Sequence, residues 1–157
     1  GSSNRFNCEG LQWLQGGLHG RRLPVHVFGR AAAIVLQGSE LVPQGSYSDW
    51  THPYEQCGVI LLASAAGTGV QIKAVEALAC GRAIVARKGA MRGLPENDGA
   101  WVEVSDPGEM VVQAIRLCSF AAPREELGAR ARQYYERHLN SDRINAKLKQ
   151  LYAELGS

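Results

Sequence analysis

The chain has 157 residues, 45% of them apolar, and a formal net charge of +2 at pH 7, which suits one globular domain with a single core. The positive charges form no lysine or arginine run of the kind that binds nucleic acid. No apolar stretch approaches the roughly 20 residues that cross a bilayer, and residues 1–5 lack the apolar segment of a signal peptide, so we expect a soluble chain without a transmembrane segment.

The first predicted elements are a helix and two short strands. Leucines recur at three- and four-residue intervals over residues 8–18, which predicts a helix. Residues 23–28 alternate between apolar and other side chains and stop at Gly29, a pattern typical of a strand that enters a tight turn. The apolar run 34–36 follows and supplies the second predicted strand.

A long irregular stretch separates these elements from a buried strand. Residues 38–56 have no strong period, and we predict a loop there with one short helix over residues 50–56. The continuous apolar run 59–63 predicts a central strand that is covered on both faces. The remaining elements follow in order as helix 70–79, strand 83–86, strand 101–104, helix 106–120, helix 123–138 and a last helix that Ser141 caps.

Five short strands that alternate with helices predict an α/β fold, a doubly wound parallel sheet of Rossmann-like type with helices on both faces. Such sheets bind ligands at the carboxyl ends of their strands. The loop 64–69, which follows the buried strand 59–63, is therefore the first place to expect a binding site.

This loop favours an anion. It passes directly into a helix, so unpaired backbone N–H groups and the positive end of the helix dipole converge there. Lys73 lies one turn into the helix and adds a positive charge, and Glu76 lies on the same helical face. The spacing alone also allows a different interpretation, in which Lys73 and Glu76 form an exposed, purely structural pair and the glycines serve only the turn.

Two common phosphate motifs are absent. A P-loop needs glycine before its lysine and serine or threonine after it, but Ile72 and Ala74 flank Lys73. The dinucleotide fingerprint needs a third glycine where Ile72 stands and an acidic residue about 20 positions later, and neither is present. We therefore expect no nicotinamide or flavin cofactor.

The cysteines and acidic residues suggest no metal site. The four cysteines are far apart, lack C-x-x-C spacing and have no histidine at zinc-finger distance, and no acidic cluster suited to a divalent cation stands out. The same spacing gives no disulfide framework and favours a cytosolic, cytoplasmic location. The cysteines are Cys8, Cys57, Cys80 and Cys118.

Residues 54–63 join a short helix to the buried strand, and residues 67–86 hold glycines at positions 67, 69 and 81 with Lys73 and Glu76 between them. Together they resemble the donor-binding core of group 1, retaining glycosyltransferases of GT-B fold, in the branch with a G-x-G-x-x-x-K-x-x-E-A-L-A-x-G segment. Residues 7–14 look like the helix near the start of this half. The resemblance implies that residues 1–157 form the carboxy-terminal, nucleotide-sugar-binding domain of a two-domain, hexosyltransferase-like enzyme.

The resemblance also assigns roles to residues. It implies that the diphosphate of the donor lies over the loop and the start of the helix, and that Glu76 accepts hydrogen bonds from the ribose hydroxyls. Lys73 either approaches the phosphates or orients Glu76, and these two residues are the candidate catalytic groups. The loop residues of the implied donor site are Gly67, Thr68, Gly69 and Val70.

A second loop adds two further candidates, and one position departs from the family. Residues 89–94 resemble the glycine-containing loop after the next strand, which brings in Gly89 and, as a weaker phosphate ligand, Arg92. Many members carry a glutamate eight positions before Glu76 that contacts the donor sugar, where this chain has Thr68. A hydroxyl can still form a hydrogen bond but supplies no negative charge.

Glycosyl transfer releases a nucleotide diphosphate whose negative charge grows as the sugar–oxygen bond breaks. Groups already aimed at that charge lower the barrier electrostatically, so no metal or cofactor is required. The acceptor and any base are expected from an amino-terminal domain of the same protein, which leaves the isolated domain inactive, and peripheral membrane association of the whole protein stays open. Two other functions also remain open: a non-catalytic nucleotide- or phosphate-binding module, and a related GT-B nucleotide-sugar epimerase.

Overall fold

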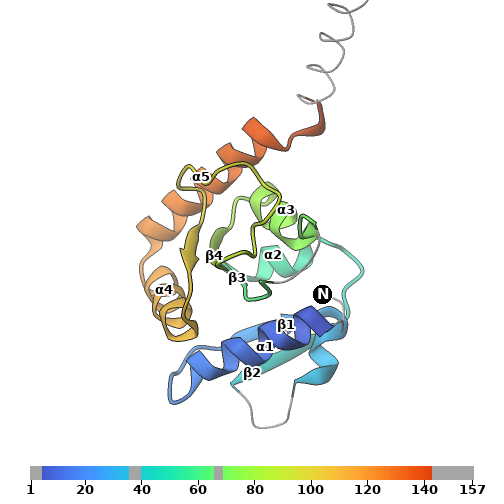
Figure 1. Ribbon diagram of the computed structural model, residues 1–157, viewed down its shortest axis with the longest axis vertical. Helices are drawn as coiled ribbons and strands as arrows, with labels where there is room; N and C mark the ends of the chain where they lie inside the picture. The colour runs from blue at the N-terminus through green and yellow to red at the C-terminus, as the bar shows by residue number, and fades with distance from the viewer. Residues whose placement is uncertain (1–4, 36–39, 66–68, 143–157) are drawn as a thin grey trace, which may run out of the picture.

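The computed structural model describes residues 5–35, 40–65 and 69–142. Helices and short strands alternate along most of this part of the chain (Figure 1). In chain order the elements are α1 (Arg5–Leu18), β1 (Val25–Phe28), the 3-10 helix η1 (Gly29–Ile34), β2 (Leu41–Gly45), α2 (His52–Gln56), β3 (Val59–Leu62), α3 (Ile72–Ala79), β4 (Ala83–Arg87), β5 (Val102–Val104), α4 (Pro107–Ser119) and α5 (Ala121–His138).

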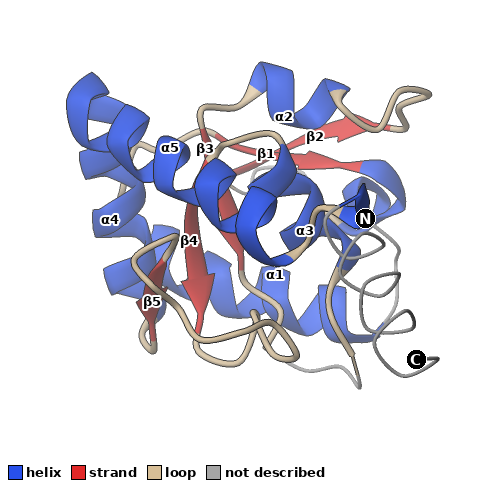
Figure 2. Ribbon diagram, turned by 90° about the horizontal axis from the view of Figure 1, so that it is seen from above, coloured by secondary structure: helices blue, strands red, loops and turns tan. Residues whose placement is uncertain are grey.

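The strands pair in parallel, in two groups. β1 pairs with β2, and β4 lies between β3 and β5. The β1–β2 pair lies on the β3 side of the larger sheet, away from β5 (Figures 1 and 2). Parallel strands joined by helices confirm the predicted Rossmann-like α/β fold, although no hydrogen bonds join the described residues of β1 to those of β3.

The second predicted strand is wrong. Within the run 34–36, Ile34 ends the 3-10 helix and Val35 is extended but unpaired, while Leu36 lies outside the described residues. The strand that pairs with β1 is β2, which lies in the stretch predicted to be a loop. β2 contains Pro43, ends at Gly45 and is mostly exposed. These are the features of an edge strand, which gives a weak signal in the sequence.

The predicted helices are confirmed within the described residues, with shifted ends. α3 begins at Ile72 instead of residue 70, because Gln71 has an extended backbone. The side chain of Asp106 accepts a hydrogen bond from the Glu109 amide and caps α4, as expected from its sequence. No helix among the described residues is both long enough and apolar enough to cross a membrane. Apart from the capping position Ser141 and Asp142, the last predicted helix lies outside the described residues.

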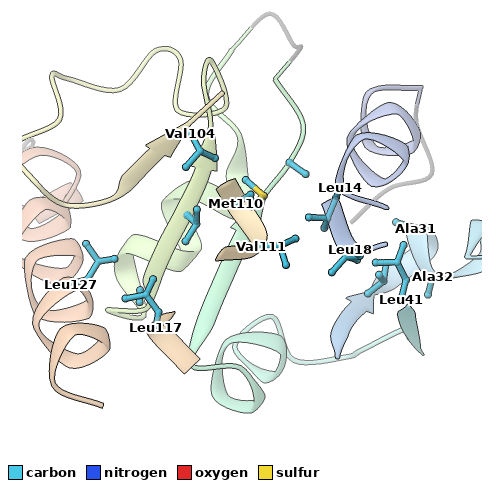
Figure 3. Packing of buried hydrophobic residues seen from close by; sticks show 14 residues of the cluster. Leu14, Leu18, Ala31, Ala32, Leu41, Val104, Met110, Val111, Leu117 and Leu127 are labelled. Atoms are coloured by element: carbon cyan, nitrogen blue, oxygen red, sulfur yellow. The ribbon is translucent and has the colours of Figure 1, made fainter. Parts of the chain in front are cut away.

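The core has two parts, one on each face of the three-stranded sheet. β4 alternates, so that Val85 joins the cluster that includes α1 and α4, whereas Ile84 joins the cluster that includes α3 and α5. Figure 3 shows the first cluster, where Leu14 and Leu18 of α1 lie beside Val111 of α4. This packing holds α1 in place next to the sheet, close to the carboxyl end of β3.

Candidate functional site

A cavity of about 650 Å³ lies between β1 and β3 and extends to α1 and the start of α3. The strand residues that face it are mainly apolar. Polar side chains gather where β3 ends and α3 begins, which is the end of a parallel sheet at which ligands bind. These side chains are Asn7, Ser64, Gln71, Lys73 and Glu76.

Three of them form one hydrogen-bonded group. The ammonium of Lys73 donates to Asn7 Oδ1 at 2.8 Å and to Ser64 Oγ at 3.3 Å. Ser64 Oγ in turn donates to Asn7 Oδ1 at 3.1 Å, and Ser64 is buried. The group therefore joins α1, the end of β3 and α3 at a single point in the cavity.

The charge of Lys73 has no acidic partner in this part of the molecule. Among the described residues, no carboxylate lies within 4.0 Å of its nitrogen. Burial lowers the pKa of Lys73 below its ordinary value, since desolvation penalises the charged form. An ammonium has three N–H donors, and two of them are engaged. The third donor and the uncompensated charge suit an anion that enters the cavity.

α1 approaches this point closely because residue 10 is glycine. A Cβ atom at Gly10 would lie 2.7 Å from Ser64 Oγ and 2.9 Å from the Ser64 backbone nitrogen. These distances are shorter than side chains tolerate, so only glycine permits this packing. Asn7, about one turn earlier in α1, is thereby brought within reach of Lys73.

Glu76 lies about one turn farther along α3 and has a different partner. The hydroxyl of Tyr54, in α2, donates to Glu76 Oε2 at 2.6 Å. Burial and, secondarily, this hydrogen bond raise the pKa of Tyr54, so the phenol remains a donor. Tyr54 is itself buried and packs in the core.

Lys73 and Glu76 do not bond to each other in the part of the chain that the structure describes. Each bonds to groups of other elements, and both are partly buried and line the same cavity. This arrangement differs from the exposed, self-paired Lys73 and Glu76 that the spacing alone allowed. Instead, both side chains line the same cavity, and each is held by hydrogen bonds to different residues.

The other predicted site residues are placed differently. Gly67 and Thr68 lie outside the described residues, whereas Gly69 and Val70 are exposed and do not line the cavity. Their roles stay predictions. Arg92 is exposed in the loop after β4, and its phosphate role also stays a prediction.

Gly89 supports the site through backbone packing. It has a φ of +88°, which favours glycine, and a Cβ atom there would lie 3.3 Å from the Ala65 carbonyl oxygen. The loop after β4 therefore packs against the loop after β3. Gln71 strengthens this contact, because its Nε2 donates to the carbonyls of Ser64 at 2.7 Å and Ala90 at 3.0 Å.

The sequence placed Ser64 in the predicted binding loop but did not single out Asn7 or Gln71, nor Arg87, which lies near the site without lining the cavity. Arg87, at the carboxyl end of β4, donates to Glu9 Oε1 at 2.7 Å and stacks over the ring of Trp13 at 4.5 Å. Two features of the sequence could have indicated the contact between α1 and the sheet. One is a basic residue at the end of a buried strand, and the other is a glycine inside a predicted helix, which marks close packing.

The described residues contain no group of three His, Cys, Asp or Glu side chains that could hold a metal ion. No disulfide joins the four cysteines within the described part of the chain, and Cys118 is exposed.

Comparison with known proteins connects this geometry with one fold. The structure of HepE from Anabaena in complex with UDP matches 98% of this chain and 47% of the HepE chain, with a TM-score of 0.76 and 14% sequence identity. The HepE complex with UDP and glucose matches 97% of this chain and 45% of HepE, with a TM-score of 0.63 and 15% identity. The chain thus spans about half the length of these structures and has the Rossmann-like fold of one half of a GT-B protein.

No curated protein sequence matches the chain. A family model does match it over residues 22–119, which is more than half of the 157 residues. The matched range includes β1, β3 and α3, and with them Lys73 and Glu76. The chain therefore belongs to the family described as glycosyl transferases group 1.

Proposed function

We propose that this chain is the donor-binding domain of a glycosyltransferase and holds a nucleotide-diphosphate sugar in the cavity between β1 and β3. The observation that carries the proposal is Lys73, a partly buried ammonium with two neutral partners and no carboxylate within 4.0 Å among the described residues. A buried charge without a counter-charge is costly. A diphosphate supplies that counter-charge.

The start of α3 adds to the positive electrostatic potential around Lys73. The N-cap residue Gln71 makes no side-chain capping bond, and the amides of Ile72 and Lys73 have no hydrogen-bond acceptor among the described residues, so these amides and the positive end of the helix dipole suit an anionic ligand. Phosphate groups commonly bind at helix starts of this kind. Fixed positive groups offset the charge of the leaving diphosphate, so the proposal includes no metal and no cofactor.

In the proposal, Glu76 binds the ribose of the same ligand. Tyr54 occupies Oε2, and Oε1 has no hydrogen-bond partner among the described residues. A carboxylate offers only acceptors and therefore suits the two hydroxyls of a ribose. With the diphosphate at Lys73 and the ribose about one helical turn away at Glu76, one nucleotide can engage both groups.

Membership of the glycosyltransferase family and the likeness to a UDP-bound protein support a nucleotide-sugar donor. A GT-B enzyme places its site between two halves, and this chain matches about half of HepE. In the proposal, the acceptor and any base come from an amino-terminal domain of the same protein. The complete protein transfers the sugar, and the present domain alone binds the donor without transfer.

Isothermal titration of the chain with UDP and GDP tests the proposal. We expect one nucleotide to bind, and Glu76→Ala to weaken binding by about 1.5–3 kcal/mol through lost charge-assisted hydrogen bonds. Glu103→Ala is the matched control, because Glu103 is exposed on β5 and does not line the cavity. No heat with either nucleotide, or equal affinity for the Glu76 variant, contradicts the proposal.

A further inference from the structure

We propose that Tyr54 is the positioning residue of the donor site: its hydroxyl holds the Glu76 carboxylate so that the site selects a ribonucleotide over a nucleotide without ribose hydroxyls. This inference rests on the proposed function and deepens it. The observation behind it is the 2.6 Å hydrogen bond from the Tyr54 hydroxyl to Glu76 Oε2, which joins α2 to α3.

The geometry makes Tyr54 a rigid support. Its side chain is only 6% exposed and packs in the cluster that contains Leu78 and Ile84. The same hydroxyl lies 3.4 Å from the Lys73 carbonyl oxygen, so it contacts α3 at two places. A tyrosine has only two side-chain torsions, and burial fixes both.

α2, which carries Tyr54, is itself anchored at its start. The hydroxyl of Thr51 lies 2.9 Å from Asp49 Oδ1 and 3.1 Å from Glu55 Oε1, and the Thr51 amide donates to the same Asp49 oxygen at 2.9 Å. The hydroxyl has one proton and donates to one of these two carboxylates at a time, and the amide bond to Asp49 ties the start of the five-residue helix to the loop before it. The support for Glu76 therefore begins in a segment that does not itself bind the nucleotide in the proposed function.

The hydrogen bond from Tyr54 lowers the entropic cost of ligand binding. A glutamate has three rotatable side-chain torsions, and ordering them when a ligand binds costs conformational entropy. The bond from Tyr54 orders the carboxylate beforehand and leaves Oε1 for the ribose hydroxyls. Loss of the hydroxyl should therefore weaken only the interactions that ribose makes.

The test compares two ligands and three variants. UDP carries both ribose hydroxyls, and 2′,3′-dideoxyuridine diphosphate carries neither. We expect the unaltered chain to bind UDP more tightly than the dideoxy ligand. Tyr54→Phe should lower the UDP affinity by roughly 5- to 20-fold, because the Glu76 carboxylate must then be ordered when the ligand binds. The dideoxy affinity should stay within about twofold, because that ligand has no ribose hydroxyls for Glu76 to bind. Glu76→Gln should reduce the same preference.

Tyr134→Phe is the matched control. Tyr134 is fully buried, its hydroxyl donates to the Pro95 carbonyl at 2.7 Å, and it does not line the cavity. This variant should leave the preference for UDP unchanged. We expect both tyrosine variants to fold, because phenylalanine keeps all the buried ring carbons of tyrosine. Thermal unfolding checks that each variant is folded.

The outcomes separate the two claims. If Glu76→Gln reduces the preference for UDP but Tyr54→Phe leaves it unchanged, or lowers both affinities equally, the positioning role of Tyr54 is wrong and the proposed function stands. If the unaltered chain binds neither ligand, the proposed function fails and the inference about Tyr54 fails with it. If the chain binds UDP but Glu76→Gln leaves the preference unchanged, the ribose role of Glu76 fails together with the inference about Tyr54.

Discussion

The ammonium nitrogen of Lys73 lies 2.8 Å from the side-chain oxygen of Asn7, although 66 positions separate the two residues. The contact requires α1 to reach the carboxyl end of β3, where Ser64 completes the group. The cationic part of the site thus depends on how α1 packs, and not only on the loop that leads into α3.

Replacement of Lys73 should separate binding from folding. Lys73→Met removes the charge proposed to face the diphosphate, and we expect UDP affinity to fall roughly 10- to 100-fold. Stability should change by less than about 1 kcal/mol, because loss of the hydrogen bonds is offset by the removal of a partly buried charge without an acidic partner. Titration calorimetry and urea unfolding measure the two effects. Arg116→Met, at an exposed position of α4, should change neither.

The pH dependence of binding should report the protonation of Lys73. Burial lowers its pKa below the ordinary value of 10.5, and a bound diphosphate favours the protonated form. UDP affinity is therefore expected to be constant below the lowered pKa and to fall as the pH rises through it, before 10.5 is reached. Lys73→Met should show no such fall. Equal curves for both proteins in calorimetry would contradict the assignment.

Replacement of two glycines of α1 by alanine should change the free energy of unfolding in opposite directions. Gly10→Ala places a Cβ atom 2.7 Å from Ser64 Oγ, and we expect a loss of stability of about 1–3 kcal/mol from overpacking together with weaker UDP binding. A Cβ atom at Gly16 meets nothing within 4 Å, so Gly16→Ala should gain about 0.5–1 kcal/mol from helix propensity. Urea unfolding measures both. Equal effects would mean that α1 does not pack closely against Ser64.

Arg87 should stabilise the contact between α1 and the sheet. Besides its bond to Glu9 and its stacking on Trp13, it lies 3.4 Å from the Ala63 carbonyl oxygen. We expect Arg87→Met to lower the free energy of unfolding by about 1–2 kcal/mol and to change the fluorescence of Trp13. The control is Arg130→Met, because the exposed pair of Arg130 with Glu126 on α5 contributes less than about 0.5 kcal/mol.

Local signals in the sequence predicted the elements around the site. The apolar run of β3 and the pattern after residue 70 correctly indicated a strand followed by a helix, and Lys73 and Glu76 of that helix line the same cavity. The cap at Asp106 likewise predicted the start of α4. These features depend on residues that are close together in the chain.

Features that depend on distant residues were not predictable in this way. Asn7 reaches Ser64 and Lys73 across 57 and 66 positions, and no period or motif encodes that contact. β2 was missed because Pro43 and its exposed side chains resemble a loop, and only its pairing with β1 makes it a strand. The bond from Tyr54 to Glu76 likewise became evident only from the fold, which brings α2 against α3.

A crystal structure of the chain with UDP is the most direct test of the donor site. We predict a phosphate oxygen within about 3.2 Å of Lys73 Nζ and the ribose hydroxyls at Glu76 Oε1, with the bond from Tyr54 to Oε2 retained. A nucleotide bound elsewhere, with Lys73 still bonded only to Asn7 and Ser64, would contradict the account.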